Sequence, residues 1–154
     1  MSDGKLHSIN VSSGGVPKLR REAAAVKRGG VEGDRQRDLE HHGGPQRAVS
    51  LYSLELIEKL RAEGHPIVAG AIGENLTLAG IDWSAMTPGR RLEVGAVKLE
   101  LTSYAAPCNI IAGAFHDGRS SRVAQKTHAG WSRLYARVLQ EGGVRIGDRV
   151  RLVE

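Results

Sequence analysis

The chain has 154 residues, which suits one domain, and we expect a single domain over residues 1–154. No apolar run approaches the ~20 residues of a membrane helix, and the first residues hold no apolar signal core, so we expect neither a membrane span nor secretion. The net charge of +5, with 16 Arg and 6 Lys, favours an anionic ligand, whereas only six aromatic residues argue against a stacking surface for nucleic acid.

Four elements are predicted in the first half of the chain. Alternating apolar residues predict a strand over residues 5–11. Residues 29–47 are rich in Gly, His and charge and show little periodicity, which is typical of a long loop with a functional role. Residues 48–53 form a second candidate strand, and a short helix follows from Ser53 as N-cap to Gly64.

The second half of the chain is predicted to hold further strands and a second helix. Glycines interrupt residues 67–83, which indicates strand pieces around a turn. Residues 90–105 alternate on both sides of Gly95 and predict a hairpin. Apolar residues at helical spacing predict a helix over residues 131–143, and the last residues predict a strand pair around Gly147.

These elements together define the expected fold class. The twenty glycines indicate a chain with many turns and more strand than helix. Several short strands with two helices predict a mainly β fold (β-rich α+β), in which a closed or nearly closed β barrel carries a few small peripheral helices.

The lone cysteine, Cys108, is the first candidate for chemistry. Pro107 lacks an N–H group, so a strand ladder should end there and leave Cys108 on a rim. A thiol at a strand exit near positive charge is held as thiolate, which is a nucleophile, a sulfur carrier or a soft-metal ligand. One cysteine cannot form an internal disulfide, which fits a reducing cytoplasm.

Two glycine-containing turns are further candidates. The stretch HHGGPQRAV, residues 41–49, gives a tight turn with exposed N–H groups that suits an anion, and Arg47 can add a guanidinium. His41 and His42 point in opposite directions in an extended chain, so at most one should face a site. In GENLTLAG, Glu74 and Asn75 offer a proton-handling carboxyl and an amide. Each turn alone is also compatible with an ordinary surface turn.

Taken together, these stretches resemble a known family. The chain contains, in this order, VPK, GDRQRD, HHGGPQRAVSLYS, GENLTLAGIDW, PGRRLEVGAVKLELTSYAAPC and YARVLQEGGVRIGD. The series resembles the MOSC domain family (the molybdenum cofactor sulfurase C-terminal domain), and in particular its free-standing bacterial members. The resemblance runs from about Val16 to Asp148.

The resemblance implies a barrel-like fold and binding of the molybdenum cofactor, a molybdopterin that carries a phosphate and a soft metal. Through the Pro-Cys motif it implies that Cys108 is the catalytic residue, as molybdenum ligand or sulfur carrier. It also implies a terminal role in the reduction of N-hydroxylated compounds. Together with the charge pattern, it predicts a cofactor pocket formed by Lys18, Arg35, His42, Gly43, Gly44, Pro45, Arg47, Glu74 and Asn75. Arg122 and Arg133 are weaker candidates.

Two departures from the family pattern bear on this prediction. Many relatives carry a basic residue shortly before the Pro-Cys pair, where this chain has Ala105 and Ala106, so that contact must come from elsewhere. The chain also lacks the pyridoxal-phosphate (PLP) desulfurase domain of full sulfurases and any iron–sulfur cysteine set. A separate electron-transfer protein or cysteine desulfurase is therefore the expected partner.

Two alternatives stay open at the level of sequence. In one, the protein is a non-catalytic carrier whose Cys108 takes a persulfide from a cysteine desulfurase. In the other, it is a basic binding module for nucleic acid or a phosphorylated ligand, with Cys108 buried and inert. We do not expect nucleic acid as the partner, because aromatic residues are scarce and basic residues are not clustered.

Overall fold

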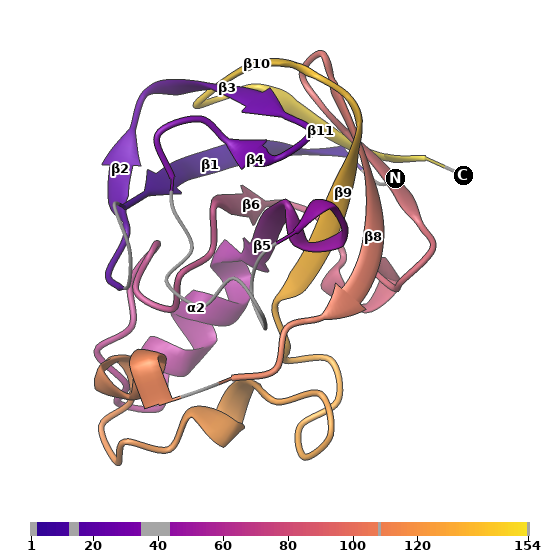
Figure 1. The fold of residues 1–154 in the computed structure, drawn as a ribbon. Coiled ribbons are helices and arrows are strands. Elements are labelled where there is room, and N and C mark those ends of the chain that lie inside the picture. The colour runs from indigo at the N-terminus through magenta and orange to yellow at the C-terminus, as the bar shows by residue number, and fades with distance from the viewer. Residues whose placement is uncertain (1–2, 13–15, 35–43, 108, 154) are drawn as a thin grey trace.

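A computed structural model describes residues 3–12, 16–34, 44–107 and 109–153 of the chain. The strands are β1 Asp3–Val11, β2 Leu19–Arg21, β3 Ala23–Lys27, β4 Gly30–Val31, β5 Val49–Ser53, β6 Leu76–Ala79, β7 Arg91–Val94, β8 Val97–Tyr104, β9 Leu134–Gln140, β10 Gly142–Arg145 and β11 Arg149–Val153 (Figure 1). The helices are α2 Leu54–Ala62 and the short 3-10 helices η1 Pro45–Arg47, η2 Trp83–Ala85, η3 Asn109–Ala114 and η4 Ser120–Val123.

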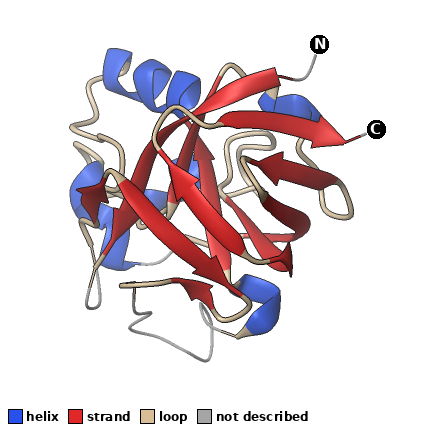
Figure 2. Cartoon of the chain, turned by 90° about the horizontal axis from the view of Figure 1, so that it is seen from above, coloured by secondary structure: helices blue, strands red, loops and turns tan. Residues whose placement is uncertain are grey.

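The larger sheet closes into a barrel. Its eight strands follow the order β11-β7-β8-β9-β5-β6-β1-β2, and β11 also pairs with β1. That extra pairing joins the two ends of the run from β11 to β1, while β2 stays outside the ring. Figure 2 shows the strands around the centre and the helices at the periphery. The expected closed β barrel with small peripheral helices is therefore confirmed.

The barrel is filled by apolar side chains from alternating strand positions, because successive side chains of a strand point to opposite faces. In the β7–β8 hairpin, Leu92, Val94 and Val97 are buried, and the intervening positions are more exposed. The hairpin turns at Gly95, whose φ of 56° lies in the left-handed region that glycine adopts without strain. The predicted strand over residues 5–11 and the predicted hairpin are both confirmed.

Helix α2 covers one end of the barrel, as its sequence predicts. The Ser53 side chain accepts a hydrogen bond from the backbone N–H of Leu56 and so caps the first turn. The buried face carries Leu56, Ile57 and Leu60, which pack into the core. In Figure 1, α2 and the segment that contains η3 and η4 lie at the lower end of the molecule. No helix within the described ranges is long and apolar enough to span a membrane.

The predicted helix over residues 131–143 is wrong, because this segment forms β9 and the start of β10. Leu134, Ala136 and Val138 are buried at period two, while Arg137 is only half-buried, so the same letters satisfy a strand pattern. Pairing with β5 on one side and β8 on the other gives β9 hydrogen bonds along both edges. This long-range pairing overrides the local helical spacing.

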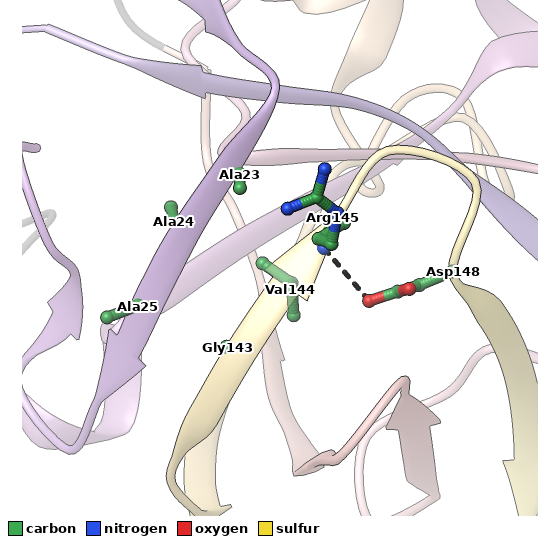
Figure 3. A pocket seen from close by; sticks show the side chains of 7 residues that line it. All are labelled: Ala23, Ala24, Ala25, Gly143, Val144, Arg145 and Asp148. Atoms are coloured by element: carbon green, nitrogen blue, oxygen red, sulfur yellow. Dashed lines mark hydrogen bonds between the residues drawn. The ribbon is translucent and has the colours of Figure 1, made fainter.

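The C-terminal strands also differ from the prediction in their partners. A turn at Gly147 separates two strands as expected, but β10 pairs with β3, and β11 pairs with β7 and β1. Strands β10, β3 and β4 make a second small sheet. A shallow groove of about 590 Å³ lies along it (Figure 3), lined by Ala23, Ala24, Ala25, Gly143, Val144, Arg145 and Asp148.

Within residues 67–83, the prediction of several strand pieces is only partly right. One strand, β6, forms at Leu76–Ala79, and residues 65–75 are turns and irregular chain. This irregular segment passes over the barrel end near Lys18, whose backbone N–H donates to the carbonyl of Gly70 at 2.9 Å. It brings Glu74 and Asn75 to the start of β6.

Candidate functional site

The two candidate turns lie at the same edge of the barrel. Helix η1 leads into β5, and the turn at residues 73–75 leads into β6. Because β5 and β6 are parallel neighbours, their first residues lie at the same edge of the sheet. A direct contact joins them, since the backbone N–H of Ser50 donates to Asn75 Oδ1 at 3.0 Å. The structure thus brings together two motifs that are 25 residues apart in sequence.

The side chain of Asn75 holds this edge together. It is fully buried, and its amide oxygen accepts from the Ser50 N–H and hydroxyl. Its amide nitrogen donates to Asp34 Oδ2 at 2.8 Å and to the Asn10 carbonyl at 3.3 Å. All four hydrogen-bonding positions of the amide are therefore used within the protein. Asn75 fixes the positions of its neighbours and has no free amide group for a ligand.

Lys18 is buried in an ion pair at the same edge. Its Nζ lies 2.6 Å from Asp34 Oδ2, and the two side chains are only 5% and 6% exposed. Asp34 also accepts the Ser12 N–H at 2.9 Å. The pair anchors the chain immediately before residue 35. Of the predicted pocket residues, Arg35, His42, Gly43 and Cys108 lie outside the described residues.

Glu74 is a buried carboxyl, and among the described residues only one of its oxygens has hydrogen-bond partners. Its Oε2 accepts the Gly70 N–H and the Thr77 hydroxyl, both at 3.0 Å. Its Oε1 is buried and has no hydrogen-bond partner among the described residues. Loss of hydration on burial raises the pKa of Glu74. The hydrogen bonds from the Gly70 N–H and the Thr77 hydroxyl, and to a smaller extent the nearby Arg133 guanidinium, counteract only part of this rise.

Arg133 connects the Glu74 turn to the segment that precedes Cys108. Its guanidinium is nearly buried, and Nη1 donates to the Ile72 carbonyl at 2.8 Å. Nη2 donates to the Ala106 carbonyl at 3.4 Å, whereas the buried Nε has no acceptor within the described part of the chain. The sequence predicts Arg133 as a weaker candidate within a helix. The structure places it just before β9, with its cation beside Ala106.

The exit of β8 is held firmly up to the proline. The Ala105 N–H donates to the Arg133 carbonyl at 3.0 Å, and the Ser132 hydroxyl donates to the Ala105 carbonyl at 3.3 Å. Pro107 then follows without an N–H to donate, and η3 begins at Asn109. The described residues on both sides of Cys108 therefore belong to an anchored strand end and a short helix.

The Gly44–Arg47 turn is an exposed corner against β8 and β9. Gly44 has a φ of 91°, and the following Pro45 begins η1. The Arg47 guanidinium carbon lies 5.9 Å from the centre of the Tyr135 ring, and the Thr102 hydroxyl donates to the Gln46 carbonyl. Arg47 is thus positioned by an aromatic face.

Several members of this polar cluster are not among the residues predicted from the sequence. Thr77 and Ser50 lie in segments predicted as strand, and Asp34 lies in the predicted loop over residues 29–47. The only hint to Asp34 in the sequence is indirect, because a lysine such as Lys18 needs an acidic partner if it is buried. The described residues contain no group of three or more His, Cys, Asp or Glu side chains arranged to hold a metal ion.

The burial of Glu74 gives a testable pH dependence. A raised pKa means that the folded state favours the protonated carboxyl. The contribution of Glu74 to the free energy of unfolding is therefore present in full below the carboxyl pKa of 4.5 in the unfolded chain, and it is lost as the pH rises through the higher pKa of the folded state. We expect Glu74→Gln to become more stable relative to wild type as pH increases from about 4.5 to about 7. Urea unfolding of both proteins across this range measures the difference. A constant difference would contradict the assignment.

A comparison with known families decides the identity of the chain. The profile described as "MOSC domain" matches residues 38–151, which is most of the sequence. The chain belongs to the MOSC domain family. The resemblance noted in the sequence is therefore confirmed, and the matched residues include β5 to β10 and the first residues of β11.

Individual relatives agree with this assignment. The chain is 30% identical to YflK of Bacillus subtilis over 154 residues, covering 98% of this chain and 66% of YflK. It is 32% identical over 131 residues to a protein named "Reductase" from Gibberella moniliformis, covering 81% of this chain and 23% of the reductase. The crystal structure of YiiM from Geobacillus stearothermophilus shares the fold, with a TM-score of 0.73, 25% identity and coverage of 98% of this chain and 75% of YiiM. This MOSC chain spans about two thirds or less of the length of these curated relatives.

Proposed function

We propose that this MOSC protein binds the molybdenum cofactor at the barrel end where the Glu74 turn meets the segment before Cys108. In this proposal Cys108 is the metal ligand. The remaining predicted residues shape or line the pocket, and these are Lys18, Arg35, His42, Gly43, Gly44, Pro45, Arg47, Glu74 and Asn75. We also propose a cytoplasmic site of action, on the ground that the chain has a single cysteine.

The observation that carries the proposal is the position of Arg133. Its guanidinium donates to the carbonyls of Ile72 and Ala106 and thereby connects the two motifs that the family resemblance assigns to one pocket. The basic residue expected shortly before the Pro-Cys pair is absent from the sequence, and Arg133 supplies a cation next to the alanines that replace it.

The chemistry of the described residues fits a cofactor with a phosphate and a soft metal. The buried Nε–H of Arg133 has no acceptor among the residues that the structure describes, and an oxyanion is an acceptor that guanidinium groups bind well. Arg47 adds a second cation at the same edge as the Glu74 turn. A thiolate from Cys108 is a soft ligand that suits a soft metal.

Within this proposal each residue has a separate task. Asn75 and Lys18 hold the edge of the barrel in place through Asp34, and Arg133 fixes the segment that carries Cys108. When bound, the cofactor would supply the redox centre for reduction of N-hydroxylated compounds. Electrons would come from a separate protein, because the chain has no iron–sulfur cysteine set.

The binding of cofactor is tested on protein produced in a host that makes it. We expect purified wild type to carry molybdenum and pterin in equal amounts, measured by elemental analysis and by pterin fluorescence after oxidative release. Arg145→Gln, in the groove of the small sheet, serves as a control and should carry the same amounts. Wild type that contains neither metal nor pterin would contradict the proposal.

A persulfide carrier is the second candidate, because the lone thiol suits either task. Incubation with a cysteine desulfurase and cysteine, followed by intact mass measurement, distinguishes the two functions. A carrier gains one sulfur atom on Cys108, and Cys108→Ala gains none. A metal ligand without carrier activity remains unmodified under the same conditions.

A further inference from the structure

The outer face of the barrel carries an excess of positive charge across five neighbouring strands. The sheet order and the pairing of β11 with β1 place β1, β11, β7, β8 and β9 side by side. In Figure 1, β8, β9 and β11 meet on the side of the molecule where both termini lie. Side chains alternate between core and solvent along each strand. The charged side chains on the solvent side, which we call the basic face, are Lys5, Arg91, Lys98, Arg137, Arg149, Arg151, Asp3, Glu93 and Glu100.

The positive charge of the basic face comes from lysine and arginine alone. Its six cations outnumber its three carboxylates, so three positive charges are in excess. This excess is more than half of the net charge of +5 of the whole chain. Lys5 and Lys98 are exposed, and neither forms an ion pair with another residue that the structure describes.

The arginines of the basic face lie outside the carboxylates that they bind. The ion pairs are Asp3 with Arg149, Glu93 with Arg151, and Glu100 with both Arg91 and Arg137. In each of them the arginine side chain is more exposed than the carboxylate, for example 50% for Arg151 against 29% for Glu93. A partner that approaches this face therefore meets guanidinium and ammonium groups first.

The carboxylates of the basic face favour a protein as the partner over a uniform polyanion. A hydrogen bond from Arg137 lowers the pKa of Glu100, so this carboxylate stays ionised at neutral pH. A nucleic acid or an anionic lipid surface presents negative charge throughout and would be repelled by such carboxylates. A protein surface with carboxylates in excess and a few cations can match both signs of charge.

The basic face ends next to the proposed cofactor pocket. Thr102 lies two residues after Glu100 in β8, and its hydroxyl donates to the carbonyl of Gln46 in η1. The next residue of η1, Arg47, is one of the predicted pocket residues and lies over the Tyr135 ring of β9. Two residues of a strand span about 7 Å. A protein docked on β8 and β9 therefore reaches the edge of the pocket.

We propose that the basic face is the docking surface for an acidic electron-transfer protein. This inference rests on the proposed function, which needs such a donor because the chain has no iron–sulfur cysteine set. Electron-transfer encounters bury less than about 1,200 Å² in total. Five strands that lie about 4.8 Å apart make a face roughly 20 Å wide, which suits an interface of that size.

An oxidised plant-type [2Fe–2S] ferredoxin, a small acidic electron carrier, is the probe. Calorimetry at low ionic strength measures its binding to the full chain and requires no bound molybdenum cofactor. We expect binding that weakens about tenfold or more when the ionic strength rises to about 0.15 M, because salt screens exposed charges. Absence of binding at low ionic strength would overturn the proposal.

The same measurement separates this inference from the proposed function. Cys108→Ser should bind ferredoxin like wild type, because the thiol lies outside the basic face. Ferredoxin binding by a wild type that never carries molybdenum would refute the proposed function alone. Wild type that carries molybdenum but does not bind ferredoxin would refute the docking surface alone.

Paired variants locate the docking surface. Lys5→Gln combined with Lys98→Gln removes two of the three excess charges and should weaken ferredoxin binding about tenfold at low ionic strength. Lys59→Gln combined with Lys126→Gln changes the net charge equally at exposed positions outside the face and should bind like wild type. Equal weakening in both double variants would overturn the assignment, since total charge would then control binding. Tighter binding of a single-stranded oligonucleotide or of phosphatidylserine vesicles through Lys5 and Lys98 would also overturn it.

Discussion

Replacing Arg133 with Met should lower the free energy of unfolding by about 3–5 kcal/mol. The side chain is nearly buried and donates to the carbonyls of Ile72 and Ala106, and both carbonyls would lose their charged donor. The buried carboxyl of Glu74 would also lose the attraction of the guanidinium. Urea unfolding at neutral pH measures the change.

Arg137→Met is the matched control for this prediction. Arg137 lies in β9, four residues further along the chain, but its side chain is 40% exposed and pairs with Glu100 at 2.6 Å. Exposed ion pairs contribute little, so we expect a loss of about 1 kcal/mol or less. Equal losses for the two variants would show that the buried position of Arg133 does not matter.

The second large effect is expected at the Lys18–Asp34 pair. Asp34→Asn keeps an oxygen acceptor for the backbone N–H of Ser12 but removes the charge that balances the buried Lys18 ammonium. Breaking a buried pair in this way costs about 3–5 kcal/mol, since the remaining charge is uncompensated. Denaturant unfolding of the variant and wild type provides the measurement.

A double variant distinguishes an uncompensated buried charge from altered packing around Asp34 as the cause of the lost stability. Adding Lys18→Met to Asp34→Asn removes the stranded cation, and we expect it to recover about half or more of the lost free energy. Glu93→Gln, which breaks the more exposed pair with Arg151, should cost about 1 kcal/mol or less. No recovery in the double variant would argue that the loss comes from packing around Asp34.

The sequence predicts those elements whose signals are local. The β7–β8 hairpin alternates strictly around Gly95, and α2 has its cap at Ser53 and its apolar face within one short segment. Nothing outside these segments is needed to recognise them. The barrel class follows from the number of such short strands and from the many glycines.

Long-range pairing explains where the prediction fails. The segment of β9 carries apolar residues that satisfy both helical and strand spacing, and its neighbours β5 and β8 decide between them. The partners of β10 and β11 could not be read from the turn at Gly147, because sheet pairing depends on strands far away in sequence.

In the candidate site, too, local motifs are predictable from the sequence, whereas their arrangement depends on long-range pairing. The turns at Gly44–Arg47 and Gly73–Asn75 were visible as motifs, but their meeting depends on the parallel pairing of β5 with β6. The role of Arg133 was hidden, because a helix would have pointed its side chain elsewhere. Only the folded chain shows that one guanidinium reaches both Ile72 and Ala106.

The molybdenum content of Cys108→Ser, purified from a cofactor-producing host beside wild type, tests metal ligation by this thiol most directly. We expect wild type to retain about one metal per chain, as a single-thiolate site requires, and the serine variant to lose it. Both proteins should unfold at the same urea concentration, which excludes a general loss of structure. A serine variant that holds as much molybdenum as wild type would contradict the assignment of Cys108 as the ligand.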